Sequence, residues 1–226
     1  MNLWDASTLV APAVIAVTLH EAAHGFVAHR FGDDTAWQAG RVSFNPLRHI
    51  DPFGTLILPG LLLWSSSGRF MFGYAKPVPV NFARLNNPRR DMVWVALAGP
   101  GTNVMLAIAS SLLLYGVGLA PANTAPWVGA NLVNSVEFNA LICVFNMLPL
   151  PPLDGGRVAV GLLPRRLAVR LAGLERYGIG IVLLLLFVLP WVGERIGWNL
   201  NILGWLVAAP AEALIRLVLA VTGQSE

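Results

Sequence analysis

The sequence predicts an all-α polytopic membrane protein, folded as a single domain over residues 1–226. Hydrophobic residues make up 56% of the chain and charged residues only 12%, whereas a soluble domain carries about 25% charged residues. About five apolar segments are long enough to cross a bilayer, which requires about 20 mostly apolar residues each. In such a chain a net charge of +3 reflects topology and does not indicate nucleic-acid binding.

The predicted transmembrane helices are separated by loops of very different length. They cover residues 8–31, 92–119, 128–148, 177–192 and 200–221. A further apolar patch, residues 53–64, is too short to span and is interrupted by Gly54, Pro59 and Gly60. We interpret this patch as a re-entrant or interfacial segment.

The long loop of residues 32–91, on the cytosolic side, contains two stretches with strand character, residues 38–44 and 72–80. Pro77 and Pro79 interrupt the second stretch, and proline within a strand is typical of a sheet edge. We therefore expect a small β-hairpin on the cytosolic face of the membrane.

Basic residues are distributed very unevenly between the loops. Apart from Arg195 and Arg216, every lysine and arginine lies in one of two regions. The first begins with Arg30, at the end of the first span, and reaches to the second span, and the other separates the third and fourth spans. Because cytosolic loops are enriched in lysine and arginine, the pattern predicts a multi-pass protein with its N-terminus outside. Five crossings would then place the C-terminus in the cytosol.

The motif H-E-x-x-H occurs within the first span, as His20, Glu21 and His24. Residues four apart share one face of a helix, so both imidazoles can bind a single zinc ion. The intervening glutamate is the usual general base of such a site. Because ionisable groups inside a bilayer are costly, their presence there indicates function.

A catalytic zinc site needs a third protein ligand, and the best candidate is Asp154. It follows three prolines, Pro149, Pro151 and Pro152, which cannot continue a helix. The third span must therefore break close to this carboxylate. The two motifs also lie at similar depths, towards the cytosolic ends of their spans.

Both motifs resemble those of the site-2 proteases, the zinc intramembrane metalloproteases. That family carries H-E-x-x-H on one span and N-x-x-P-x-x-x-L-D-G on a later one. The second motif matches here without a gap from Asn146 to Gly155. The segment Ala98-Gly-Pro-Gly-Thr-Asn103 is similar to the family's A-G-P-x-x-N segment. The resemblance is closest to the short bacterial and archaeal members without PDZ or CBS domains, which implies a prokaryotic cell membrane.

The resemblance implies specific roles for these residues. His20, His24 and Asp154 would bind Zn²⁺, Glu21 would activate water, and Asn146 would hydrogen-bond the substrate backbone or the developing oxyanion. The substrate would be a transmembrane helix of another membrane protein, cut within or near the lipid bilayer. The predicted edge strand at residues 72–80 could hold an extended substrate by strand addition, a hypothesis that deleting this stretch would test.

Other interpretations remain beside these. A membrane transporter or ion-handling protein could also place histidine and aspartate on broken helices, although the chain has no duplicated half. Gly99, Gly101 and Asn103 are typical of close helix packing.

Asn146 could equally form an interhelical hydrogen bond, as could Asn139, which lies seven residues earlier on the same face. His29 points away from the pair, and His49 with Asp51 is more typical of a buried turn than of a second metal site. Glu137 is more typical of a polar pair than of catalysis.

Overall fold

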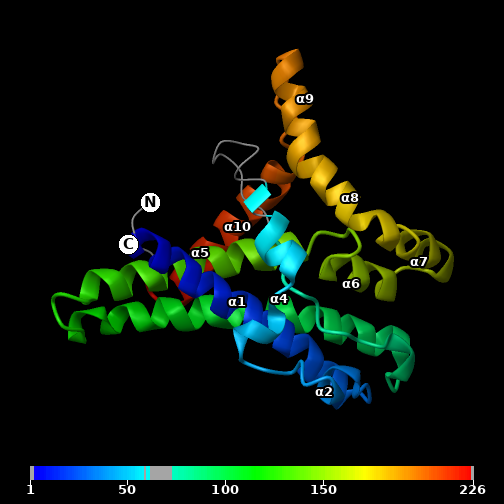
Figure 1. Cartoon of the computed structure of the whole chain (residues 1–226), viewed down its shortest axis with the longest axis horizontal. Helices are drawn as coiled ribbons and strands as arrows, with labels where there is room; N and C mark the ends of the chain where they lie inside the picture. The colour runs from blue at the N-terminus through cyan, green and yellow to red at the C-terminus, as the bar shows by residue number, and fades with distance from the viewer. Residues whose placement is uncertain (1–2, 59, 62–72, 225–226) are drawn as a thin grey trace.

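The computed structural model describes residues 3–58, 60–61 and 73–224 and is helical (Figure 1). Three long helices form its centre: α1 (Leu3–Arg30), α4 (Pro88–Leu113) and α5 (Ala125–Asn146). Each packs against the other two, and α10 (Ile202–Val221) covers α4 and α5. Shorter elements carry the chain between them. These are α2 (Thr35–Gln38), η1 (Pro46–His49), η2 (Pro52–Ile57), η3 (Phe82–Arg84), η4 (Leu114–Leu119), α6 (Asp154–Leu162), α7 (Arg165–Ala172), η5 (Glu175–Tyr177), α8 (Gly178–Leu183), η6 (Leu184–Val188) and α9 (Leu189–Ile196).

Five helical segments of the described chain are long and apolar enough to cross a membrane, as predicted. They are Ser7–Arg30, Pro88–Leu119, Ala125–Asn146, Arg165–Ile196 and Ile202–Val221. The fourth is longer than expected, because α7, η5, α8, η6 and α9 follow one another almost without interruption. The protein is therefore a multi-pass membrane protein.

Small side chains bring the central helices close together. Ala107, Val136 and Val218 join α4, α5 and α10 in one buried cluster, and Ala28 and Val95 join α1 to α4 in another. Transmembrane helices gain little from the hydrophobic effect inside lipid, so close packing of small residues is a main source of their association. This packing brings the backbones of α1 and α4 close enough for the side chains of one to reach the other.

The start of α4 and the end of α5 are fixed by local sequence. Pro88 occupies the first turn of α4, where its missing N–H is not needed, and the Asp91 carboxylate accepts a hydrogen bond from the Asn87 N–H at 2.6 Å. After α5 the proline-rich turn reverses the chain into α6. A Cβ on Gly155 or Gly156 would collide with the backbone of this turn, so the reversal depends on both glycines.

The predicted β-hairpin is wrong, because the structure has no β-strand within the residues that it describes. Residues 38–44 include the end of α2 and a loop, and residues 73–81 form an extended segment, called here the strap; Phe72 lies outside the described residues. The strap pairs with side chains and isolated carbonyls in place of a second strand. Its N–H groups at Tyr74 and Lys76 donate to Gly54 O and His49 O.

The strap is held by side chains as well. Arg41 donates to the Lys76 carbonyl at 2.7 Å, and the Asp33 carboxylate accepts from the Asn81 N–H at 2.6 Å. The predicted re-entrant segment is described only at residues 53–58, 60 and 61, which are helical and include most of η2. Its position relative to the membrane stays a prediction.

Both ends of the chain lie at the same end of the bundle (Figure 1). Near the N-terminus, Ser7 and Thr8 accept hydrogen bonds from Trp127 and Asn134 of α5. Near the C-terminus, Thr222 bonds Ser111 and Tyr115, and Gln224 donates to Ser111 O at 2.6 Å. The last turn of α4 and the first turn of α5 share this end, because only η4 and a short loop separate them.

The predicted placement of the C-terminus on the opposite side from the N-terminus stays a prediction, and the arrangement of the bundle favours the alternative that both ends share one side. Five spans place the termini on opposite sides only if every apolar segment crosses once alongside its neighbours. In the structure the rod formed by α8, η6 and α9 points away from the bundle instead of returning along it (Figure 1). Consequently α10 runs towards the end at which the chain began.

We expect topology reporters fused before Met1 and after Glu226 to report the same side of the membrane. A third reporter, inserted after Gly173 at the arginine-rich end, should report the opposite side. Alkaline phosphatase and fluorescent-protein fusions measure this directly. Termini on opposite sides would support the charge-based topology against the arrangement of α10 described above.

Candidate metal centre

His20 and His24 lie on successive turns of α1 and point to one side. Both are buried, with 5% and 7% of their surface exposed. Their Nε2 atoms are 3.1 Å apart, as the i,i+4 spacing allows. The buried face of a predicted membrane-spanning helix thus presents two imidazole nitrogens to the same point.

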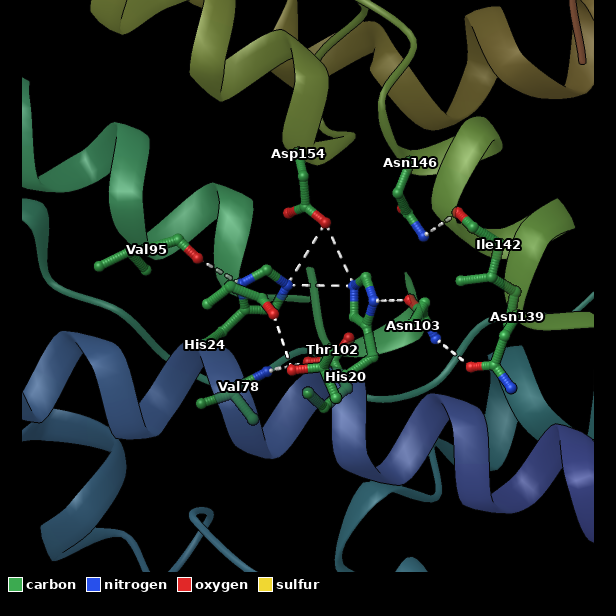
Figure 2. Close-up of polar contacts among 12 residues, drawn as sticks. His20, His24, Val78, Val95, Thr102, Asn103, Asn139, Ile142, Asn146 and Asp154 are labelled. Atoms are coloured by element: carbon green, nitrogen blue, oxygen red, sulfur yellow. Dashed lines mark hydrogen bonds and ion pairs between the residues drawn. The ribbon is translucent and has the colours of Figure 1, made fainter. Parts of the chain in front are cut away.

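Asp154, the first residue of α6, brings a carboxylate to that point from the opposite side (Figure 2). Its Oδ2 lies 3.1 Å from His20 Nε2 and 3.3 Å from His24 Nε2. The residue is 5% exposed, and Oδ2 accepts no hydrogen bond. Burial alone would raise the pKa of the Asp154 carboxyl, and positive charge beside it, carried in the absence of a metal by the His24 and His20 rings, holds that pKa well below its usual range. The group is therefore an ionised acceptor when a cation lies beside it.

The outer nitrogens of both imidazoles are occupied, which fixes their protonation. His24 Nδ1–H donates to the carbonyl of Val95 at 2.7 Å, and His20 Nδ1–H donates to Asn103 Oδ1 at 2.6 Å. A carbonyl oxygen can only accept, so the proton of each neutral ring resides on Nδ1. Each Nε2 therefore directs a lone pair at its neighbours.

Three acceptor atoms that face one another at 3.1–3.3 Å repel unless a cation lies among them. Tetrahedral zinc, with bonds of about 2.0–2.1 Å, separates its ligand atoms by about 3.3–3.4 Å. Two imidazoles and a carboxylate with hydrogen-bonded outer nitrogens are also a common catalytic zinc set. His20, His24 and Asp154 thus fit the metal in chemistry and in spacing.

Gly99 of α4 provides the space in which the two rings lie. A Cβ at this position would collide with the Nε2 atoms of both His20 and His24. By contrast, a Cβ on Gly101, two residues further along the same helix, would meet nothing within 4 Å. The glycine at position 99 is required by close approach and not by backbone conformation.

Glu21 projects from α1 beside the pair and contacts the strap. Its Oε2 accepts the N–H of Val78 at 2.8 Å. Val78 lies between Pro77 and Pro79 and therefore carries the only N–H in that run of three. The carboxylate is partly buried, and this backbone donor orients it.

Asn146 ends α5 and is partly buried. Its amide donates to Ile142 O at 3.2 Å within its own helix. Figure 2 shows it projecting on the side of the site where Asn103 lies. The interhelical hydrogen bond considered for Asn146 is instead made by Asn139, which accepts from Asn103 at 2.8 Å.

Comparison with known proteins agrees with this site. The chain is 39% identical over 197 residues to YwhC of Bacillus subtilis, covering 84% of each chain. It is 31% identical over 201 residues to Rip2 of Mycobacterium tuberculosis, covering 88% of this chain and 72% of the relative. MJ0611 of Methanocaldococcus jannaschii is 29% identical over 141 residues, 62% of each. All three carry the name "Putative zinc metalloprotease".

The chain belongs to the site-2 protease family. No family model matches it, and no solved structure does. Its kinship with these relatives makes it a zinc metalloprotease, and the cofactor is Zn²⁺.

Sequence reasoning about this site-2 protease missed the role of the 98–103 segment. Gly99 and Asn103 were interpreted as helix packing, yet both contact the predicted zinc ligands. The signal was present in the A-G-P-x-x-N motif, which places glycine and asparagine four residues apart on one helical face.

The remaining candidates lie elsewhere in the site-2 protease. His29 pairs with Asp34 at 2.5 Å and stacks on Trp37. His49 is buried and donates to Ser43 O, while Asp51 accepts from Gly54 N–H at the start of η2. Both contacts match the turn network expected for them. Glu137 is exposed on the surface of α5.

We expect Gly99→Ala to lower the affinity for zinc by at least about tenfold, because the new methyl group displaces both imidazoles. Gly101→Ala is the matched control and should bind zinc like the native protein. Alanine favours a helix over glycine at both positions, so weakening of α4 cannot produce the difference. Competition with a chromophoric chelator gives the affinities, and equal values for the two variants would contradict the close approach.

Proposed function

We propose that this protein is an intramembrane zinc endopeptidase that cleaves transmembrane segments of other membrane proteins. The observation that carries the proposal is the buried triangle of His20 Nε2, His24 Nε2 and Asp154 Oδ2, built on a helix long and apolar enough to span. Ionisable groups on helices that cross a membrane are costly, so their presence there indicates a function within the membrane. The family membership supports the same reaction class.

The residues divide the work of peptide hydrolysis. His20, His24 and Asp154 would hold zinc, which when bound lowers the pKa of its water towards about 7 and polarises the scissile carbonyl. Glu21 would take the proton of the attacking water and pass it to the leaving amine. The Val78 N–H keeps one carboxylate oxygen in place and leaves the other free for this transfer.

Asn146 would add a hydrogen-bond donor for the substrate backbone or the developing oxyanion. Its present bond to Ile142 O is long, at 3.2 Å, and stays within α5. The Ile142 carbonyl is also the natural helical acceptor of the Asn146 N–H, so releasing the side chain leaves no backbone group unpaired. The amide can therefore turn to a substrate at little cost.

The substrate would be a transmembrane helix that unwinds locally before it is cut. A helix hides its peptide carbonyls in internal hydrogen bonds, so an intact one offers no carbonyl to the site. We place the arginine-rich end of the bundle, where α1 ends and α4, α6 and α7 begin, on the cytosolic side. The site lies towards that end, so the cut would fall in the cytosolic half of the membrane of a prokaryotic cell, and the N-terminus would lie outside.

Replacing the base should separate catalysis from metal binding. We expect Glu21→Gln to lower the cleavage rate by roughly 10²–10⁴-fold while the protein keeps one zinc per chain. Glu137→Gln, which removes the exposed carboxylate of α5, is the control and should cleave normally. Zinc content by mass spectrometry and cleavage in reconstituted vesicles give both readouts. Native activity in Glu21→Gln would rule out the assigned role.

The position of the cuts tests where in the membrane the enzyme acts. Membrane-protein fragments from cells with native protein and cells with Glu21→Gln can be compared by sequencing their new termini. We expect the termini that depend on activity to fall within apolar spans of the substrates, in their cytosolic halves. Termini confined to water-exposed loops would identify a membrane-anchored protease that acts outside the bilayer.

A further inference from the structure

A line of hydrogen bonds leads from a predicted zinc ligand through three helices (Figure 2). His20 Nδ1–H of α1 donates to Asn103 Oδ1 of α4. The Asn103 amide donates at 2.8 Å to Asn139 Oδ1 of α5, whose own amide donates to the backbone carbonyl of Ser135 at 2.8 Å. Asn103 and Asn139 are 0% and 1% exposed, so bulk water does not reach these two amides.

The direction of this line is as important as its existence. An asparagine amide has an accepting end and a donating end, and only the accepting end can receive a proton from His20 Nδ1. With the amide reversed, the proton of the neutral ring would have to move to Nε2, where it would block the lone pair aimed at the metal. A buried amide in contact with the ring therefore decides whether His20 can act as a ligand.

The direction is fixed at the far end, by a group that cannot be reversed. The Ser135 carbonyl only accepts, so it holds the donating end of Asn139. Asn139 then turns its oxygen to Asn103, and Asn103 turns its own oxygen to His20. His24 needs no such line, because the Val95 carbonyl accepts from it directly.

We propose that Asn103 and Asn139 are positioning residues that fix the orientation and the proton of His20, with Asn139 acting on the metal ligand only through Asn103. The inference rests on the zinc site of the proposed function and does not depend on the substrate. Hydrogen-bond partners of metal-bound histidines typically change metal affinity by about 10–100-fold when they are removed. Neither asparagine belongs to the group of residues that would hold the metal.

The first measurement is zinc affinity, by chelator competition with the purified full-length protein. Asn103→Leu should weaken binding by roughly 10–100-fold and Asn139→Leu by about tenfold. Ser111→Ala is the matched control, because it also removes a buried interhelical hydrogen bond from α4, to Thr222, at the far end of the helix. It should bind zinc like the native protein, and the visible absorption of the cobalt-loaded protein should change only in the asparagine variants.

The decisive measurement is a double-mutant cycle with Asn103→Asp. Both oxygens of an aspartate accept, so the side chain at position 103 no longer has a wrong direction. An aspartate oxygen at position 103 would face Asn139 Oδ1 with no hydrogen between them, so adding Asn139→Leu, which removes that contact, should not weaken zinc binding in this background. A packing role for Asn139 would instead give the same loss in both backgrounds.

Equal losses in the two backgrounds, or no loss with Asn139→Leu alone, would overturn the proposal. Circular dichroism identifies the variants that fold, and where Asn139→Leu does not fold, Asn139→Ala carries the same comparison. Because the readout is metal affinity, the proposal can survive a failure of the proposed function. If zinc affinity changes as expected in the double-mutant cycle but the protein cleaves no membrane substrate, only the proposed protease function is contradicted.

Discussion

The mutual approach of three hydrogen-bond acceptors governs the architecture of this protein. Two imidazole lone pairs and a carboxylate oxygen face one another at 3.1–3.3 Å in a buried site. Without a cation this contact is repulsive, so the binding energy of the metal is also energy for folding the site. The packing of α1 on α4 and the reversal from α5 into α6 both converge on this contact. Neither the close packing nor the chain reversal would be needed if the three ligands did not have to meet.

Small residues and prolines have complementary roles in bringing the three ligands together. Gly99 lets α4 approach the rings, and Gly155 and Gly156 let α6 begin directly beneath the end of α5. The prolines at 149, 151 and 152 prevent α5 from continuing as a helix and so deliver Asp154 back to the bundle. A straight third span would carry the same carboxylate away from the histidines. The break in the helix is thus the feature that converts a two-ligand motif into a three-ligand site.

Features that depend on local spacing could be predicted from the sequence, and those that depend on packing could not. His20 and His24 share a face by helical geometry alone. Asp154 could be predicted as the third ligand because the prolines before it must break the third span. The five apolar helices follow from composition and length. The role of Asn103 could not be predicted, because it depends on which end of the amide faces His20. The contact with Asn139 determines that orientation, and sequence spacing does not show it. The placement of the C-terminus depended on whether the segment Arg165–Ile196 runs along the bundle, and hydropathy carries no information on direction.

The failure of the predicted hairpin has a physical reason that bears on catalysis. A strand needs regularly spaced N–H donors, and Pro77 and Pro79 remove two of them from the strap. What remains between them is the single N–H of Val78, which a ladder cannot use efficiently but a lone carboxylate can. Glu21 accepts it at 2.8 Å, and Arg41 and Asp33 hold the strap on either side. A partly buried anion in a membrane-spanning helix needs such a donor, and a backbone amide supplies one without bringing a second charged side chain into the site. The same prolines that abolish the strand thus leave a single backbone donor that orients the proposed base.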